Sequence, residues 1–177
     1  MATQEKKLYD LEKWSNEGLI LHFITATGIL RSSFSNGSAR NQYKAASLKV
    51  VGKLMKKVDS GSLTNRDIRK GILELRKKAR CSVGLAQKGI NVVLKYYCFA
   101  RKANARLLKA LDCPIDSRII TYYYKAGRNK PHYRLLKLGW EDYKFLQGLI
   151  EKKEGVRILG EWVYEDEYQG NALKARL

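Results

Sequence analysis

The stretch that decides the fold runs from residue 39 to residue 80 and reads ARNQYKAASLKVVGKLMKKVDSGSLTNRDIRKGILELRKKAR. In its first half, apolar side chains recur at steps of three and four residues, at Ala45, Leu48, Val51, Met55 and Val58. This spacing is typical of the buried face of an amphipathic helix. Lysines cover much of the remaining surface, and a Ser-Gly pair at residues 60 and 61 ends the pattern. We therefore expect a basic helix over residues 39–58.

A second helix is expected from Thr64 to about Arg80. Thr64 has the side chain of an N-cap residue, and Asp67 stands at the third helical position, in a relative of the capping box. The side chains expected to face inward are Ile68, Ile72, Leu75 and Ala79. The cations left for the outer surface are Arg66, Arg69, Lys70, Arg76, Lys77 and Lys78. Two basic helices joined by a short turn predict a DNA-binding pair; the alternative is that the lysines only solvate two helices.

A third, more apolar helix is expected over residues 83–102, with Ile90, Val93, Leu94 and Tyr97 in the core. Lys88, Asn91 and Lys95 stand three and four residues apart, so they share one face of this helix, and Gln87 lies beside Asn91. A narrow polar stripe on an apolar helix predicts either a functional site or a buried hydrogen-bond network. The sequence leaves both interpretations open.

The later part of the chain begins with an extended segment, because Pro114 disfavours a helical Cys113. Asp116 is expected to cap the element that follows it. Residues 118–124 are rich in β-branched and aromatic side chains, and residues 125–131 read as a turn. We therefore predict a small β-hairpin near residues 118–138, with a basic tip of Lys125, Arg128 and Lys130.

A last helix is expected over residues 140–152, with Tyr143, Leu146 and Ile150 facing inward, and a short strand over residues 156–164. The fold class that results is mainly α: one compact helical domain spanning residues 1–177, with the hairpin as its one β feature. A chain of 177 residues suits a single domain with a real hydrophobic core.

The charge of the chain is large and unevenly distributed. The formal net charge is +18. Residues 31–134 carry 25 basic and 5 acidic groups, a net of +20, whereas residues 141–177 carry 6 basic and 8 acidic groups and form an acidic C-terminal segment. So many like charges repel one another in a folded domain, and a phosphate backbone is the commonest polyanion that offsets this repulsion. The charge therefore predicts nucleic acid as the partner.

Several other functional classes are excluded. The sequence contains no phosphate-binding loop, no nucleophile elbow and no HExxH motif. The three cysteines, Cys81, Cys98 and Cys113, form no close pair, which predicts reduced thiols in a cytoplasmic setting. No metal-ligand spacing links them to the two histidines, so no metal and no cofactor are expected. The apolar run at residues 18–30 is too short to span a membrane, and no membrane partner is expected.

One pattern carries chemistry. It reads Val83-Gly-Leu-Ala-Gln-Lys88-Gly-Ile-Asn91-Val-Val-Leu-Lys95-Tyr-Tyr and is followed by Cys113-Pro-Ile-Asp116-Ser-Arg-Ile. This pattern resembles the catalytic core of helix-hairpin-helix DNA glycosylases, especially the 8-oxoguanine and archaeal GO types. The resemblance covers about 35 of the 177 residues, and the glycine-to-lysine spacing in the hairpin is longer than the family's.

The resemblance implies an all-helical DNA-repair protein that acts on duplex DNA as a base-excision glycosylase and AP lyase. Either Lys88 or Lys95 would be the nucleophile that forms a Schiff base with the deoxyribose of an extruded nucleotide. Asp116 would stabilise the positive charge that develops on the sugar.

The residues by themselves also leave two non-catalytic functions open. In the first, a winged-helix-like DNA-binding or regulatory protein inserts the helix of residues 64–80 into the major groove and uses the hairpin as a wing. In the second, tyrosines among basic residues stack on single-stranded RNA. The expected nucleic-acid contacts are Arg66, Arg69, Lys70, Arg76, Lys77, Arg118, Lys125, Arg128, Lys130 and Arg134. The sequence does not fix an oligomeric state.

Overall fold

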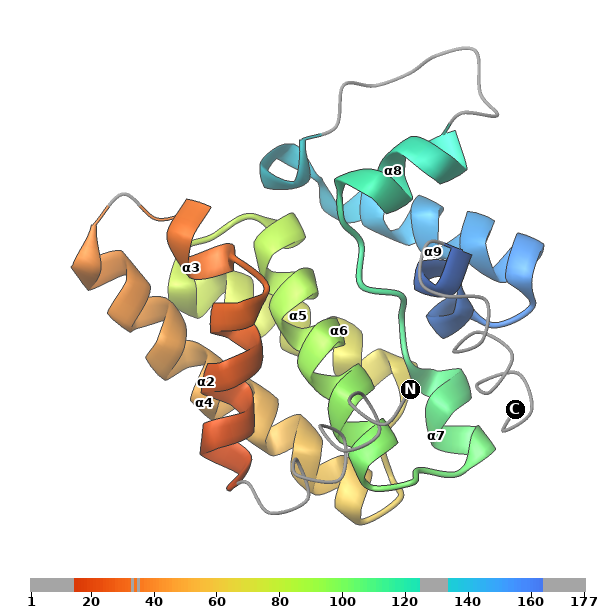
Figure 1. The fold of residues 1–177 in the computed structure, drawn as a ribbon, viewed down its shortest axis with the longest axis horizontal. Helices are drawn as coiled ribbons and strands as arrows, with labels where there is room; N and C mark the ends of the chain where they lie inside the picture. The colour runs from red at the N-terminus through yellow and green to blue at the C-terminus, as the bar shows by residue number, and fades with distance from the viewer. Residues whose placement is uncertain (1–14, 33, 35, 125–133, 164–177) are drawn as a thin grey trace, which may run out of the picture.

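The computed structural model describes residues 15–32, 34, 36–124 and 134–163. These residues form helices joined by short connections, and no strand occurs among them, so the mainly α fold class is confirmed. In chain order the α-helices are α2 (Asn16–Ala26), α3 (Ile29–Ser32), α4 (Gly37–Asp59), α5 (Asn65–Ala79), α6 (Val83–Ala100), α7 (Ala105–Ala110), α8 (Ser117–Tyr124) and α9 (Trp140–Glu154). Two 3-10 helices, η1 (Leu135–Lys137) and η2 (Arg157–Val163), complete the described fold (Figure 1).

Helices α4 and α5 begin at polar caps. The Asn36 side chain accepts a hydrogen bond from the backbone N–H of Ala39 at 2.8 Å. The capping box predicted at the start of α5 is present, because the side chains of Thr64 and Asp67 each accept a hydrogen bond from the other's backbone N–H. These bonds satisfy amide groups that the first turn of a helix leaves without partners.

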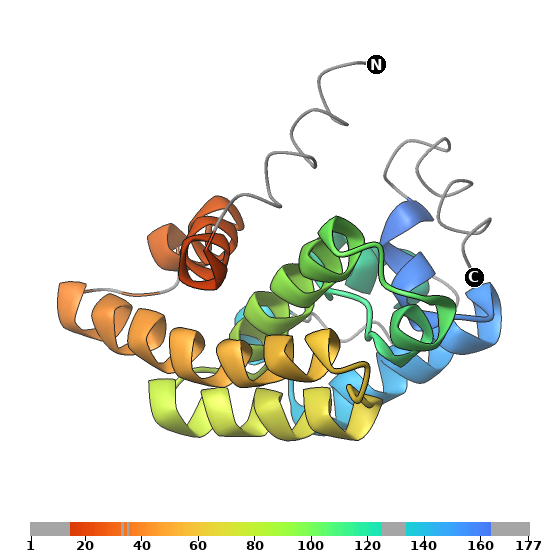
Figure 2. The same ribbon diagram turned by 90° about the horizontal axis from the view of Figure 1, so that it is seen from below.

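The two helices pack as an antiparallel pair at one side of the molecule (Figure 2). The inward face predicted for α5 is confirmed, since Ile68, Ile72, Leu75 and Ala79 are buried. On α4 the buried face is rotated slightly from the predicted one. Val51, Met55 and Val58 are buried as expected, but Ala45 is exposed and Leu48 is only half-buried. Other side chains join the buried face instead, among them Tyr43, Ala46, Val50 and Leu54.

Helix α6 lies at the centre of the fold and contacts α2, α4, α5, α7, α9 and η1 (Figures 1 and 2). Ile90, Val93, Leu94 and Tyr97 are buried, as predicted. Glycine lets neighbours approach this helix closely: a Cβ atom at Gly84 would collide with the carbonyl oxygen of Leu135 in η1. The face of α6 that carries Gly84 is therefore turned toward the later helices of the chain.

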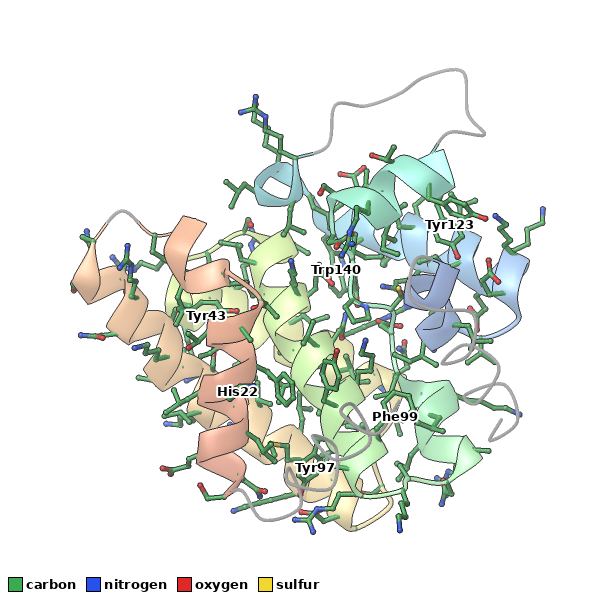
Figure 3. The ribbon with its side chains drawn as sticks, in the orientation of Figure 1. His22, Tyr43, Tyr97, Phe99, Tyr123 and Trp140 are labelled. Carbon is green, nitrogen blue, oxygen red and sulfur yellow. The ribbon has the colours of Figure 1, made fainter. Side chains whose placement is uncertain are left out.

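The predicted β-hairpin is absent from the described residues. Residues 117–124, which have strand-like composition, form α8. Ile119, Ile120 and Tyr123 are buried at helical spacing, and the Tyr123 hydroxyl donates a hydrogen bond to Glu154 in α9 at 3.0 Å (Figure 3). Packing on α9 and capping by Asp116 therefore override the local β propensity. The expected tip residues Lys125, Arg128 and Lys130 lie outside the described residues.

The short strand predicted for residues 156–164 is also wrong where the structure describes it, because residues 157–163 form the 3-10 helix η2. The helix predicted for residues 140–152 is confirmed as α9, with Tyr143, Leu146 and Ile150 buried. No helix within the described ranges is long and apolar enough to cross a bilayer.

Candidate nucleic-acid interface

The outer face of α5 carries four exposed cations, Arg66, Lys70, Arg76 and Lys77, which we call the basic ridge. Arg66, Lys70 and Lys77 follow one another at steps of four and seven residues, so they line up along one side of the helix. Within the described part of the chain, none of the four forms an ion pair with a carboxylate. The sequence predicted all four as nucleic-acid contacts, and the structure leaves all four side chains exposed.

The acidic residues of α5 are occupied on the side of the helix that faces α4. Glu74 pairs with Lys53 of α4 at 3.3 Å and with Lys78 at 3.7 Å. Asp67 pairs with Lys57 at 2.7 Å. The hydrogen bonds from Lys57 and Thr64 lower the pKa of Asp67 to about 2, so this carboxylate stays ionised at neutral pH. Both acidic side chains of α5 are thus paired with lysines near α4, whereas the ridge keeps its positive charge.

Arg69, which the sequence also predicted as a nucleic-acid contact, is placed differently from the ridge. Its side chain is 31% exposed, and its Nε lies 3.6 Å from a carboxylate oxygen of Asp112. The Asp112 side chain is completely buried. Arg69 therefore extends from the same helix as the ridge toward the interior, where it helps to neutralise a buried charge.

Asp112 is the centre of a buried polar cluster. Its two oxygens accept hydrogen bonds from the Asn65 amide at 2.6 Å and from the Tyr143 hydroxyl at 2.7 Å. The Nε atom of Arg157 in η2 lies 2.7 Å from the Oδ1 atom of Asp112. Neither this Nε nor that of Arg69 has the alignment of a hydrogen bond. Burial, and then the charge of Asp112, raise the pKa of Tyr143 well above its usual value, so its hydroxyl remains a donor. The cluster thus joins α5, α9 and η2 around Asp112.

Two glutamines hold the extended segment that contains Asp112. Gln87 of α6 donates to the carbonyl oxygen of Ile115 at 2.7 Å and accepts from its N–H at 3.0 Å. Gln147 of α9 makes the same pair of bonds with Cys113, at 2.7 and 3.0 Å. Each side-chain amide thus makes the pair of hydrogen bonds that a neighbouring β-strand would make. The backbone N–H and carbonyl groups of Cys113 and Ile115 therefore have partners although the segment belongs to no sheet.

The polar stripe predicted on α6 separates into two kinds of residue. Gln87 and Asn91 belong to the buried hydrogen-bond network, and the Asn91 amide donates to the Tyr143 hydroxyl at 2.9 Å. Lys95 is also buried, with 1% of its surface exposed, and its amine lies 4.6 Å from the centre of the Tyr96 ring. Lys88, by contrast, is partly exposed.

Asp116 caps α8. One of its oxygens accepts hydrogen bonds from the backbone N–H groups of Arg118 and Ile119 at 2.9 and 3.0 Å, and the other pairs with the Arg118 guanidinium at 3.3 Å. The capping role expected from the sequence is confirmed. Arg118 and Arg134, the remaining predicted contacts in the described ranges, are both exposed near this end of the molecule.

Sequence reasoning missed two groups of residues. The first is the buried cluster, because nothing in the sequence distinguishes Asp112 from the solvated acids. The second is a set of exposed cations after α6, namely Arg101, Arg106 and Lys109. The absence of any acidic residue between positions 75 and 111 would have pointed to them.

The described residues contain no group of three or more histidine, cysteine, aspartate or glutamate side chains placed to hold a metal ion. Comparison of the chain with protein-family models, with curated proteins and with solved structures finds no match.

Proposed function

We propose that this protein binds nucleic acid, with duplex DNA as the preferred form, through the basic ridge of α5. The observation that carries the proposal is the separation of charge on this helix: the acids are paired on the inner side and the four cations of the ridge have no carboxylate partner in the described part of the chain. Unpaired, exposed cations on a rigid element are suited to phosphate contacts. The three cysteines form no disulfide, which fits the cytoplasmic setting that we propose with it.

The dimensions of the ridge suit a duplex. The eleven-residue separation of Arg66 and Lys77 corresponds to about 16 Å along the helix. The major groove of B-DNA is about 12 Å wide. A helix lying across the groove would therefore place these two side chains at phosphates on opposite edges, with Lys70 between them.

The salt dependence of binding tests this proposal. For the unmodified protein and a 20-bp duplex, the logarithm of the affinity should fall against the logarithm of the salt concentration with a slope of roughly −5 or steeper. Replacing Arg66, Lys70 and Lys77 with Ala should make the slope shallower by about 2 to 3, because each phosphate contact contributes about 0.9. The matched control replaces Lys144, Lys152 and Lys153 of α9 with Ala, which removes the same charge from another surface.

A flat salt response of the unmodified protein would contradict the proposal. Equal slopes for the ridge variant and the α9 control would show that the protein does not bind DNA through the ridge. Tighter binding to single-stranded RNA than to the duplex under identical salt would favour the RNA-binding alternative.

A second candidate function is that of a DNA glycosylase and AP lyase, and one contact favours it. The paired hydrogen bonds between Gln87 and Ile115 fasten the start of α6 to the segment before α8. Lys88 directly follows Gln87, and Asp116 directly follows Ile115. The clamp therefore brings a lysine and a carboxylate that are 28 positions apart into one neighbourhood, and both are partly exposed.

The different burial of Lys88 and Lys95 decides which of them is the better candidate for the nucleophile. An amine that attacks a sugar must reach it, and the 1% exposure of Lys95 leaves no room for a DNA strand at that position. Lys88 is partly exposed, and it stands one helical turn after Gly84, the glycine that η1 approaches closely. We therefore propose Lys88 as the nucleophile and Asp116 as the group that stabilises the positive charge on the sugar.

Trapping with borohydride tests the chemistry. The lysine amine condenses with the aldehyde of the base-free deoxyribose, water leaves, and hydride reduces the imine to a stable amine. With a duplex that contains intact 8-oxoguanine, the protein should become covalently attached. The Lys88→Gln variant should lose the adduct but keep its affinity for the duplex, whereas Lys95→Gln should form the adduct if it folds.

The Asp116→Asn variant separates chemistry from structure. Asparagine is also a good N-cap residue, so α8 should remain intact while the rate of base release falls by orders of magnitude. If no lesion in a broad panel is excised and no adduct forms, the protein binds DNA without this chemistry.

A further inference from the structure

A second basic surface lies where α6 ends and α7 begins. It consists of Arg101, Arg106 and Lys109, which we call the α6–α7 corner. All three side chains are exposed, and no acidic residue occurs between positions 75 and 111. The Arg101 guanidinium lies 5.3 Å from the centre of the Tyr97 ring, near the lower end of α6 in Figure 3. The corner therefore presents three exposed cations where α6 passes into α7, and the carboxylate nearby is that of Asp59, which accepts a hydrogen bond from Tyr97.

The corner adjoins the start of the basic ridge. The Asn65 amide, in the first turn of α5, donates to the carbonyl oxygen of Ala110 at 3.2 Å, at the end of α7. Arg66, the first cation of the ridge, follows Asn65 directly. The end of α6 is joined to the same region, because the Tyr97 hydroxyl donates to Asp59 at the end of α4 at 2.7 Å. Figure 2 looks onto this edge of the molecule, where the end of α4 leads into α5 beside α7.

We infer that the α6–α7 corner is a second contact for the phosphate backbone of the same nucleic acid, continuing the track that the basic ridge begins. This inference rests on the proposed DNA binding. It requires a duplex that extends past the phosphate contacted by Arg66, since the corner lies beyond the first turn of α5. Two of the three cations are arginines, whose planar guanidinium matches a phosphate in two hydrogen bonds.

The composition of the corner favours nucleic acid over a membrane surface. A helix that binds an anionic bilayer buries large apolar side chains among its cations. In the described ranges the exposed large apolar side chains are Leu73, Leu136 and Phe145, and none belongs to the corner. A surface with cations and no apolar anchor is suited to a hydrated phosphate backbone.

The test compares three triple variants: Arg101, Arg106 and Lys109 to Ala in the corner; Arg66, Lys70 and Lys77 to Ala in the ridge; and Lys144, Lys152 and Lys153 to Ala on α9. On a 20-bp duplex, the corner variant should have a salt slope shallower than that of the α9 control by about 2 to 3. The region that it protects from hydroxyl-radical cleavage should be shorter at one end. The thermal midpoint should stay close to that of the α9 control, because each variant removes three charged side chains and a contact with a tyrosine ring, that of Arg101 with Tyr97 in the corner and that of Lys153 with Tyr122 on α9.

The outcomes separate this inference from the proposed function. If the ridge variant is weakened while the corner variant matches the α9 control in slope and footprint, the inference is overturned and the proposed function stands. If the unmodified protein shows no salt-dependent binding, both fail. If the corner variant instead loses binding to phosphatidylserine vesicles and keeps its full salt slope on DNA, the corner is a membrane contact and the inference is overturned.

Discussion

The basic ridge of α5 and the buried cluster around Asp112 each include an arginine from the same helix. Arg66 and Arg69 are three residues apart, yet Arg66 is exposed without a carboxylate partner in the described ranges, whereas Arg69 reaches a completely buried carboxylate. The difference comes from the direction in which each side chain leaves the helix, not from its chemistry. Counting the cations of a sequence therefore overestimates the number that can contact phosphates, because some of them neutralise charges inside the fold.

The largest effect is expected in the buried cluster. Replacing Asp112 with Ala leaves Arg69 without its counter-charge, leaves Arg157 with Glu151 as its remaining carboxylate, and takes the acceptor from the Tyr143 hydroxyl. Removing one partner of a buried ion pair costs about 3 to 5 kcal/mol. Urea denaturation should show this loss, while Asp116→Ala, which removes a helix cap, should lose only about 1 kcal/mol. Similar losses for the two variants would show that Asp112 is not central to the fold.

A smaller loss is expected when one of the glutamine clamps is removed. In Gln147→Leu, the N–H of Cys113 loses the side-chain oxygen that accepts from it, while the carbonyl oxygen of Cys113 keeps the hydrogen bond from the Asn91 amide at 3.4 Å. Because the loss of buried hydrogen bonds of this kind costs about 1 to 3 kcal/mol, the free energy of unfolding should fall by about 1 to 3 kcal/mol.

The matched control for this clamp is Gln42→Leu. Gln42 is exposed and makes one hydrogen bond to the backbone of Lys78, so the change should stay within about 0.5 kcal/mol. DNA affinity should be unaltered in both variants, since neither touches the ridge. A loss of affinity in a folded Gln147→Leu protein would show that the segment of residues 113–115 takes part in binding.

The sharpest comparison uses the two neighbouring arginines. Arg69→Ala should reduce the free energy of unfolding by about 1 to 2 kcal/mol, because its partner is buried although its own side chain is partly exposed. Arg66→Ala should leave stability within about 0.5 kcal/mol but make the salt slope of DNA binding shallower by about 0.9. Unfolding curves give the free energy of unfolding of each variant, and salt titrations give the salt slope of its DNA binding. The opposite pattern would mean that the two sides of α5 have exchanged roles.

The smallest effect concerns pH. Since the native pKa of Asp67 is about 2, below its value of about 4 in the unfolded chain, its stabilising contribution is present above pH 4 and is lost as the pH falls toward 2. The Asp67→Asn variant should therefore be less stable than the unmodified protein at pH 6, by about 1 kcal/mol or less for so exposed a pair. The difference should disappear near pH 2. A gap that persists there would come from the lost geometry of the cap and not from the charge.

The helices of this protein follow from local sequence patterns. The capping box at Thr64 and the inward faces of α5, α6 and α9 were predictable because side-chain periodicity and cap chemistry act within a few residues. The strand-like composition of residues 118–124 was misleading for the same reason. Their helix depends on a cap at Asp116 and on packing against α9, which are not visible in the segment itself.

For the candidate sites, the sequence by itself determined the excess of positive charge, its placement in residues 31–134 and the identity of the ridge cations. Only the tertiary structure decided which polar residues are buried. It placed Arg69 on Asp112, enclosed Lys95 while leaving Lys88 partly exposed, and joined residue 87 to residue 115. The physical reason is that burial and ion pairing depend on distant parts of the chain: Asp112 lies 43 positions from Arg69, and Ile115 lies 28 positions from Gln87. No local periodicity records such neighbours.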